Sequence, residues 1–107
     1  MLSAAIVSTD EYQQEPDEFE DTGNLIHSQG LNKLVHLNKY GMEYLSNGNF
    51  KESHLKLKLA EKIVTAMQDN YSDDYYKLYS LTMNNLGCYY KKIFKPNVAL
   101  KYLKLAL

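Results

Sequence analysis

Residues 37–60 read LNKYGMEYLSNGNFKESHLKLKLA, and residues 83–106 read MNNLGCYYKKIFKPNVALKYLKLA. Aligned at an offset of 46 positions, the two stretches show one pattern twice. Identical residues recur at this offset: Asn38 and Asn84, Gly41 and Gly87, Tyr44 and Tyr90, and a closing Leu-Lys-Leu-Ala. A fixed period of tens of residues indicates stacked structural repeats, and such arrays usually build surfaces that bind other proteins.

Apolar and small residues within each copy recur three or four positions apart, the spacing of one face of an α-helix. One series runs Phe50, Ser53, Leu57, Ala60, Val64, Met67, and another runs Tyr79, Met83, Leu86, Tyr90, Ile93. No stretch of useful length has the period of two that is typical of a strand. The sequence therefore predicts an all-α protein, with helices near 31–46, 50–68, 74–93 and 97–107 in two antiparallel hairpins, 31–68 and 74–107.

Glycines and capping residues support these helices. Gly41 and Gly87 lie inside them, where a glycine costs about 1 kcal/mol relative to alanine. We therefore expect each glycine to lie where two helices approach closely. Capping signals stand at the helix starts: Asn49 with Glu52, then Ser72 or Asp73, then Pro96 in the first turn of the last helix.

The residues resemble a known family. The first copy carries Leu37, Tyr40, Gly41, Tyr44, Gly48, Phe50, Ser53, Leu57 and Ala60, and the second carries Met83, Leu86, Gly87, Tyr90, Ala99, Leu103 and Ala106. Both series resemble the tetratricopeptide repeat (TPR), whose usual period is about 34 residues. The longer period is similar to that of kinesin light chains and related cargo adaptors. The resemblance covers residues 31–107 and implies an α-solenoid of antiparallel hairpins, with these two repeats forming part of a longer array.

One departure from the family pattern concerns the turns between helices. Phe94 and Pro96 stand where the first copy has Gly48 and Phe50. We therefore expect the second turn to differ from the first in detail.

The resemblance also implies a binding groove. In TPR arrays the first helix of each hairpin lines a concave surface that holds an extended peptide. The positions so implied are Asn38, Met42, Leu45, Asn84, Asn85, Cys88, Lys91 and Lys92, with Val35 and Leu81 beside them. An asparagine can bond a peptide backbone because it carries a donor and an acceptor on one side chain, and lysines would meet acidic groups. A solvated helix face is the alternative interpretation of the same residues.

Charge divides the chain into two parts. Residues 10–21 hold seven acidic residues and no basic one, whereas all 12 Lys lie between Lys33 and Lys104. Low apolar content and charge of one sign predict a disordered acidic tail over residues 1–30. The tail contains Tyr12 and Phe19, and aromatic-acidic peptides resemble the ligands of kinesin-light-chain-type grooves. It is expected either to compete for the groove or to remain solvated.

Catalytic and metal-binding patterns are missing from the sequence. His27, His36 and His54 lack the spacing of metal ligands, and Cys88 reads as a packed apolar residue with no activating neighbour. There is no phosphate-binding glycine loop. We therefore expect no enzymatic activity, no cofactor and no metal. The chain has no secretory signal, no apolar run near the ~18 residues of a membrane span, and one Cys, which together favour the cytoplasm.

Three classes of function remain open. The first is an adaptor that binds an acidic or aromatic-acidic peptide segment, and the second is a structural subunit of a large cytoskeletal or ciliary assembly. A nucleic-acid binder is disfavoured, because the lysines are spread over all helices, Arg is absent and the acidic tail would compete. The apolar residues 105–107 predict that further repeats or a partner cover the C-terminal end.

Overall fold

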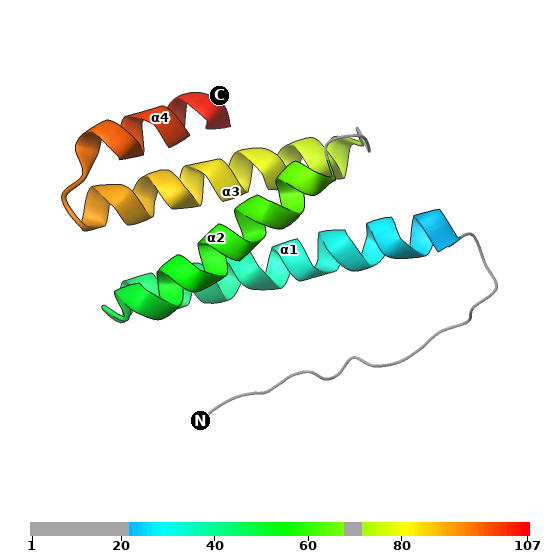
Figure 1. Cartoon of the computed structure of the whole chain (residues 1–107), viewed down its shortest axis with the longest axis horizontal. Helices are drawn as coiled ribbons and strands as arrows, with labels where there is room; N and C mark the ends of the chain where they lie inside the picture. Colours follow the sequence, from blue (N-terminus) through cyan, green and yellow to red (C-terminus); the bar gives the residue numbers. More distant parts are fainter. Residues whose placement is uncertain (1–21, 68–71) are drawn as a thin grey trace.

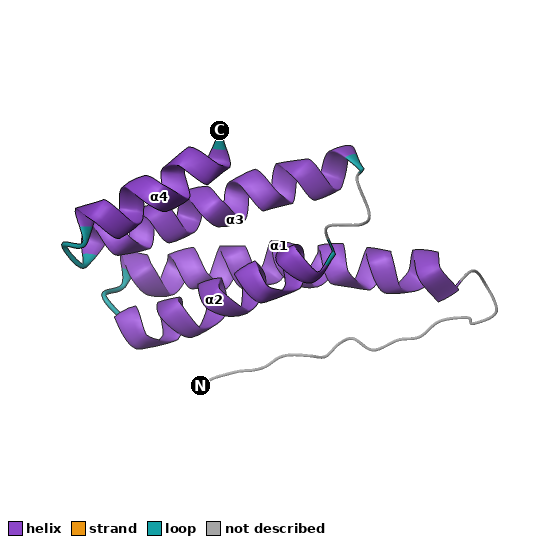
Figure 2. Ribbon diagram, turned by 45° about the horizontal axis from the view of Figure 1, so that its top comes forward, coloured by secondary structure: helices purple, strands orange, loops and turns teal. Residues whose placement is uncertain are grey.

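The computed structural model describes residues 22–67 and 72–107, and all regular secondary structure within these ranges is helical. Its four helices are α1 (Thr22–Ser46), α2 (Phe50–Ala66), α3 (Asp73–Lys92) and α4 (Pro96–Ala106). They form two antiparallel hairpins, α1–α2 and α3–α4, with α1 and α3 running side by side (Figure 1). Helix α2 also packs on α3 (Figure 1), and α4 lies along α3 (Figure 2), with its Tyr102 side chain also reaching Lys58 of α2. The prediction of an all-α protein is confirmed.

Helix α1 begins well before the predicted residue 31, so residues 22–30 are helical and are not part of a disordered tail. A reason for the longer helix lies at Gly30. A Cβ on this residue would lie only 2.9 Å from Met67 Sδ, so this turn of α1 packs closely against the end of α2. The predicted start of the first helix, residue 31, is therefore too late. Residues 1–21, which hold the acidic cluster, and residues 68–71 lie outside the described ranges.

The other helix ends fall close to their predicted positions, and side chains explain where the helices start. The Asn49 side chain accepts a hydrogen bond from the Glu52 N–H at 3.3 Å. Ser72, not Asp73, caps α3, and its hydroxyl accepts from the Tyr75 N–H at 3.0 Å. Each bond satisfies a backbone donor that the first helical turn leaves unpaired. Pro96 occupies the first turn of α4.

Close helix contact at the two interior glycines is also confirmed. A Cβ at Gly41 would lie 2.7 Å from Leu57 Cδ2, and a Cβ at Gly87 would lie 2.6 Å from Leu103 Cδ2. Both pairs join the first helix of a hairpin to the second, and the sequence offset relates one pair to the other. The same glycine-leucine contact therefore closes both hairpins.

The second turn differs from the first in its cap, as expected, but keeps the same backbone: Asn49 caps α2 with its side chain, whereas Lys95 makes no side-chain cap bond to α4. Gly48 has φ +81°, and Phe94, at the equivalent position, has φ +65°. The residue after each of them donates a backbone bond of 2.8 Å: Asn49 to the Tyr44 carbonyl, and Lys95 to the Tyr90 carbonyl. The backbone pattern is thus kept although the glycine is not. Phe94 adopts the left-handed conformation at an energetic cost that glycine avoids.

The core of the two hairpins consists of two apolar clusters, and each draws side chains from α1, α2 and α3. Its most deeply buried side chains come from three helices: Leu34 of α1, Leu57, Ala60 and Val64 of α2, and Met83 and Leu86 of α3. Helix α4 adds Ala99, which is also buried. Because α2 contributes to the contacts within its own hairpin and to those with α3, the two hairpins pack as successive layers.

Candidate protein-binding surface

Three of the predicted groove residues lie in the packed interior. Asn38 is 2 % exposed, and Leu45 and Asn85 are each 6 % exposed. The Asn85 side chain donates a hydrogen bond of 2.9 Å to Asn38 Oδ1. The prediction that these three residues face an open groove is therefore corrected, because their side chains are already used where the hairpins meet.

The two asparagines belong to a buried polar network between α1 and α3. Asn38 Nδ2 donates to Thr82 Oγ1 and to the Leu34 carbonyl, both at 2.9 Å. Thr82 in turn donates to the Leu78 carbonyl at 2.7 Å. Thr82 was not among the predicted site residues, although it lies on the same helical series as Leu78 and Asn85. A buried polar network of this kind fixes the alignment of two helices, since each group needs its own partner.

Met42 and Cys88 border this network on one open side of the molecule. On α1, Gly41 faces α2 and Asn38 faces α3. Continuing around the helix in the same direction, past Asn38, the next side chains are Met42 and Val35. On α3, Gly87 faces α4 and Asn85 faces α1, and Leu81 and Cys88 come next in the same way. The side chains of both pairs therefore lie on the side of α1 and α3 that is turned away from α2 and α4. We call this surface the α1–α3 face and define it by Val35, Lys39, Met42, Leu81, Cys88 and Lys92.

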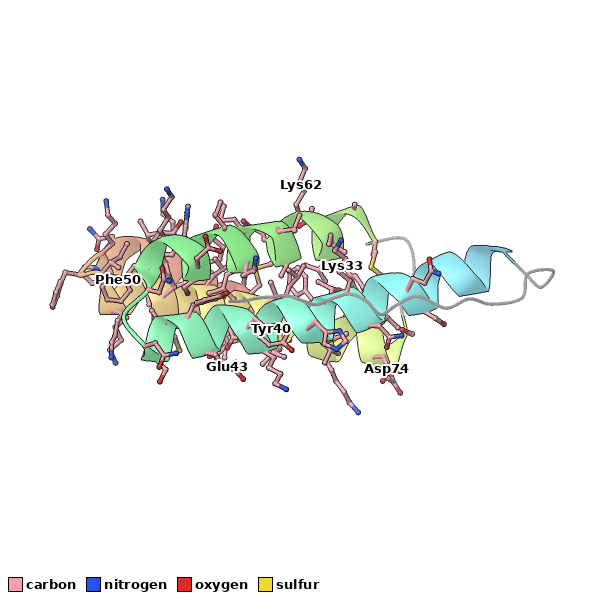
Figure 3. The ribbon with its side chains drawn as sticks, turned by 90° about the horizontal axis from the view of Figure 1, so that it is seen from below. Lys33, Tyr40, Glu43, Phe50, Lys62 and Asp74 are labelled. Carbon is pink, nitrogen blue, oxygen red and sulfur yellow. The ribbon has the colours of Figure 1, made fainter. Side chains whose placement is uncertain are left out.

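The α1–α3 face has an apolar strip with charges around it. Val35 is 49 % exposed and Leu81 is 42 % exposed, while Met42 and Cys88 are half-buried. Lys39 and Lys92 are exposed beside the strip. Figure 3 shows two acidic side chains on the side away from α2, Glu43 of α1 and Asp74 at the start of α3. The charge on this side is thus mixed, with its basic end at the last turn of α3.

Neither lysine of this face is held in an ion pair by the described residues. The ion pairs in residues 22–67 and 72–107 join Lys56 to Glu52 at 3.7 Å and Lys58 to Glu61 at 2.6 Å, both along α2. Lys39 instead lies over the Tyr40 ring, 5.6 Å from its centre. The ammonium group of Lys92 is therefore available to an acidic group from another molecule.

Asn84 and Lys91 are exposed but point elsewhere. At the sequence offset they match Asn38 and Leu45, the residues with which α1 meets α3. They consequently lie on the side of α3 that is turned away from the first hairpin. The eight predicted groove residues thus divide among the interior, the α1–α3 face and this outer side.

A second polar cluster links α2 to α4. Lys58 Nζ donates to Glu61 Oε1 at 2.6 Å and to the Tyr102 hydroxyl at 3.2 Å. The bond to Glu61 raises the pKa of Lys58 above its ordinary value. The lysine remains charged near neutral pH, and its bond to Tyr102 joins α2 to α4.

Neither a metal cluster nor a membrane span is present in the described part of the chain. Across residues 22–67 and 72–107, His, Cys, Asp and Glu do not gather in threes where they could hold a metal ion. None of the described helices is long and apolar enough to cross a membrane. Comparison with known proteins gives no match among family models, curated proteins or solved structures.

Proposed function

We propose that this protein is a non-enzymatic protein-interaction module of the TPR type, in which the α1–α3 face binds an extended segment of a partner protein. The observation that carries the proposal is the exposure of Val35 and Leu81 on two adjacent helices, with half-buried Met42 and Cys88 about two turns further along the same helices. A contiguous apolar surface with a polar rim is typical of a binding surface.

The chemistry of the face indicates the kind of segment that fits. The apolar strip suits aliphatic or aromatic side chains, which gain most from leaving water. Lys92 at the end of α3 suits a carboxylate, because a charge-assisted hydrogen bond forms without displacing an existing partner. The proposed ligand is therefore an extended peptide that combines apolar or aromatic residues with acidic ones.

A labelled peptide with the sequence of residues 10–21, DEYQQEPDEFED, provides a defined probe of this chemistry. Its binding to the full chain is measured by fluorescence anisotropy at low ionic strength. Leu81→Asp removes apolar surface and Lys92→Glu reverses the charge, so each is expected to weaken binding about tenfold, or about 1.4 kcal/mol. Added salt should weaken binding to the unaltered chain, because it screens the lysine.

Lys62→Glu provides a matched control. This lysine is exposed on α2 and points away from α1, as Figure 3 shows. Its reversal changes the net charge as much as Lys92→Glu does, yet it should leave the affinity nearly unchanged. Equal weakening by the two reversals would mean that overall charge, and not the α1–α3 face, attracts the peptide.

The alternative function is a structural subunit of a large cytoskeletal or ciliary assembly, and a different observation favours it. Leu100 and Leu105 of α4 are each more than half exposed. Helices at the surface of a finished assembly usually turn such residues inward. A peptide adaptor in the cytoplasm would saturate with one short peptide in solution, whereas an assembly subunit would bind only folded neighbours.

A further inference from the structure

The two hairpins have the same internal contacts but different surroundings. In the first, Asn38 is buried because Thr82 and Asn85 of the second hairpin hydrogen-bond to it at 2.9 Å. In the second, the equivalent residue is Asn84, which is exposed. The asparagine of the first hairpin is thus bonded by the hairpin that follows it, whereas in the described part of the chain no hairpin packs on the equivalent asparagine of the second hairpin.

Helices α2 and α4 show the same difference. The ring of His54 on α2 lies 5.2 Å from the ring of Tyr89 on α3, and its equivalent on α4 is Leu100, which is 53 % exposed. Leu57 on α2 is fully buried, whereas the equivalent Leu103 is only half-buried. Helix α4 therefore presents apolar side chains where α2 contacts the next hairpin. We call the surface made by Asn84, Leu100, Leu103 and Leu107 the outer face.

At the opposite end of the two-hairpin array, the exposed side of α1 is polar. Helix α3 meets the first hairpin through four buried residues: Leu78, Thr82, Asn85 and Tyr89. Their equivalents on α1 are all polar and exposed: Asn32, His36, Lys39 and Glu43. The two ends therefore differ in the side chains of α1 and α3, although Leu55 and Leu59 of α2 in the first hairpin are exposed as well.

We propose that the outer face binds a third helical hairpin, whose leading helix presents a threonine and an asparagine three residues apart to Asn84. Its apolar residues would cover Leu100 and Leu103, as α3 covers Leu57. Lys91 stands at the position of buried Leu45, and its long side chain can lie along a neighbour while its ammonium group reaches water. This surface is separate from the α1–α3 face, and its occupation does not depend on peptide binding there.

A second copy of the same chain fits this surface poorly. A symmetric dimer through α4 would bring Lys101 and Lys104 of both copies together, and α4 has no acidic residue to offset them. A head-to-tail contact would place the polar side of α1, with His36 and Lys39, on exposed Leu100. Each arrangement leaves charges or polar groups facing an apolar or like-charged surface.

The sequence period allows a direct test. Appending a second copy of residues 62–107 after Leu107 continues the repeat in register, since Leu107 matches Glu61 at the sequence offset. The added helix then presents copies of Thr82 and Asn85 to Asn84. Thermal unfolding of the extended chain is expected to be a single transition, with a Tm about 5 °C or more above that of the natural chain.

Asn84→Ala separates docking from a general effect of length. It should change the Tm of the natural chain by less than about 1 °C and lower the Tm of the extended chain by several degrees. Asn32→Ala, an exposed asparagine of α1, is the matched control and should have equally small effects in both chains.

Three outcomes would overturn the proposal. The extended chain could melt in two separate steps, or at the Tm of the natural chain, which would show that the added hairpin does not dock. Asn84→Ala could have the same effect in both chains, which would remove Asn84 from the contact. Finally, the natural chain could sediment as a dimer that Leu100→Lys dissociates, in which case a second copy is the occupant.

Discussion

Asn85 of α3 donates a hydrogen bond of 2.9 Å to Asn38 of α1, and this bond lies inside the contact between the two hairpins. Replacing either residue with alanine leaves the other unsatisfied in the interior, which should lower the free energy of unfolding by about 1–3 kcal/mol. The double variant should cost less than the two single costs added together, because both remove one bond. Urea unfolding of the three variants measures these differences. Asn84→Ala, on the exposed equivalent, should change stability by less than about 0.5 kcal/mol.

The contact between Gly87 and Leu103 gives a second prediction. Gly87→Ala would raise helix propensity by about 1 kcal/mol in open space. Here the new Cβ would lie 2.6 Å from Leu103 Cδ2, so overpacking should lower stability by about 1–3 kcal/mol, and Gly87→Leu by more. Combining Gly87→Ala with Leu103→Ala makes room for the methyl group, and the loss should be smaller than the sum of the single losses. A strictly additive pair would show that the two residues do not touch.

Ser53 gives a third prediction, in the stabilising direction. Its side chain is fully buried, and its hydroxyl oxygen has no hydrogen-bond partner among the described residues. The equivalent residue in the second hairpin is Ala99. Ser53→Ala should therefore raise the free energy of unfolding by about 1 kcal/mol, seen as a higher Tm. A lower Tm would mean that the hydroxyl has a partner in solution, such as an ordered water.

Phe94 gives a fourth prediction, because it adopts φ +65° with its side chain 89 % exposed. The left-handed conformation costs a non-glycine residue about 1–2 kcal/mol, and the greater freedom of glycine in the unfolded chain offsets part of that gain. Phe94→Gly should therefore stabilise the fold by about 0.5–1 kcal/mol. Gly48→Ala, at the equivalent position, should destabilise it by a similar amount. Chemical denaturation of both variants checks the sign, and two changes in the same direction would contradict the equivalence of the turns.

The helices, apart from the start of α1, their caps and the glycine contacts could be predicted from the sequence because they depend on local spacing. The helical period places Gly41 and Gly87 inside helices, and the cost of an interior glycine is enough to predict a close helix contact at each. The groove residues could not be placed in this way. Whether Asn38 faces solvent or α3 depends on how α1 is rotated against α3, and Thr82 and Asn85 set that rotation from more than 40 positions away.

The second turn shows the same limit in a different way. The sequence predicted a second turn that differs in detail, and its cap does differ, yet the hydrogen bond from Lys95 to Tyr90 and the packing of α4 on α3 maintain the backbone conformation of the first turn. The packing of α4 on α3 outweighs the preference of Phe94 for a negative φ, and the sequence around Phe94 does not show how strong that packing is.

Alkaline pH gives the last prediction. Burial raises the pKa of the Tyr89 phenol above its ordinary value, and the nearby Tyr90 adds to the shift. In the unfolded chain Tyr89 loses its proton near pH 10, whereas in the folded chain it keeps the proton to higher pH. The contribution of this group to stability is therefore complete below about pH 10 and is lost as the pH rises through its folded pKa, since the unfolded state then binds fewer protons.

Tyr89→Phe removes the ionisable group while keeping the ring that packs against His54. Its stability at neutral pH should be close to that of the unaltered chain, and its loss of stability between about pH 9 and pH 11 should be smaller. Urea midpoints measured across this range give the comparison. If Tyr89→Phe loses stability over this range just as the unaltered chain does, the Tyr89 phenol ionises in the folded protein as freely as it does in water, and its burial does not oppose the charge.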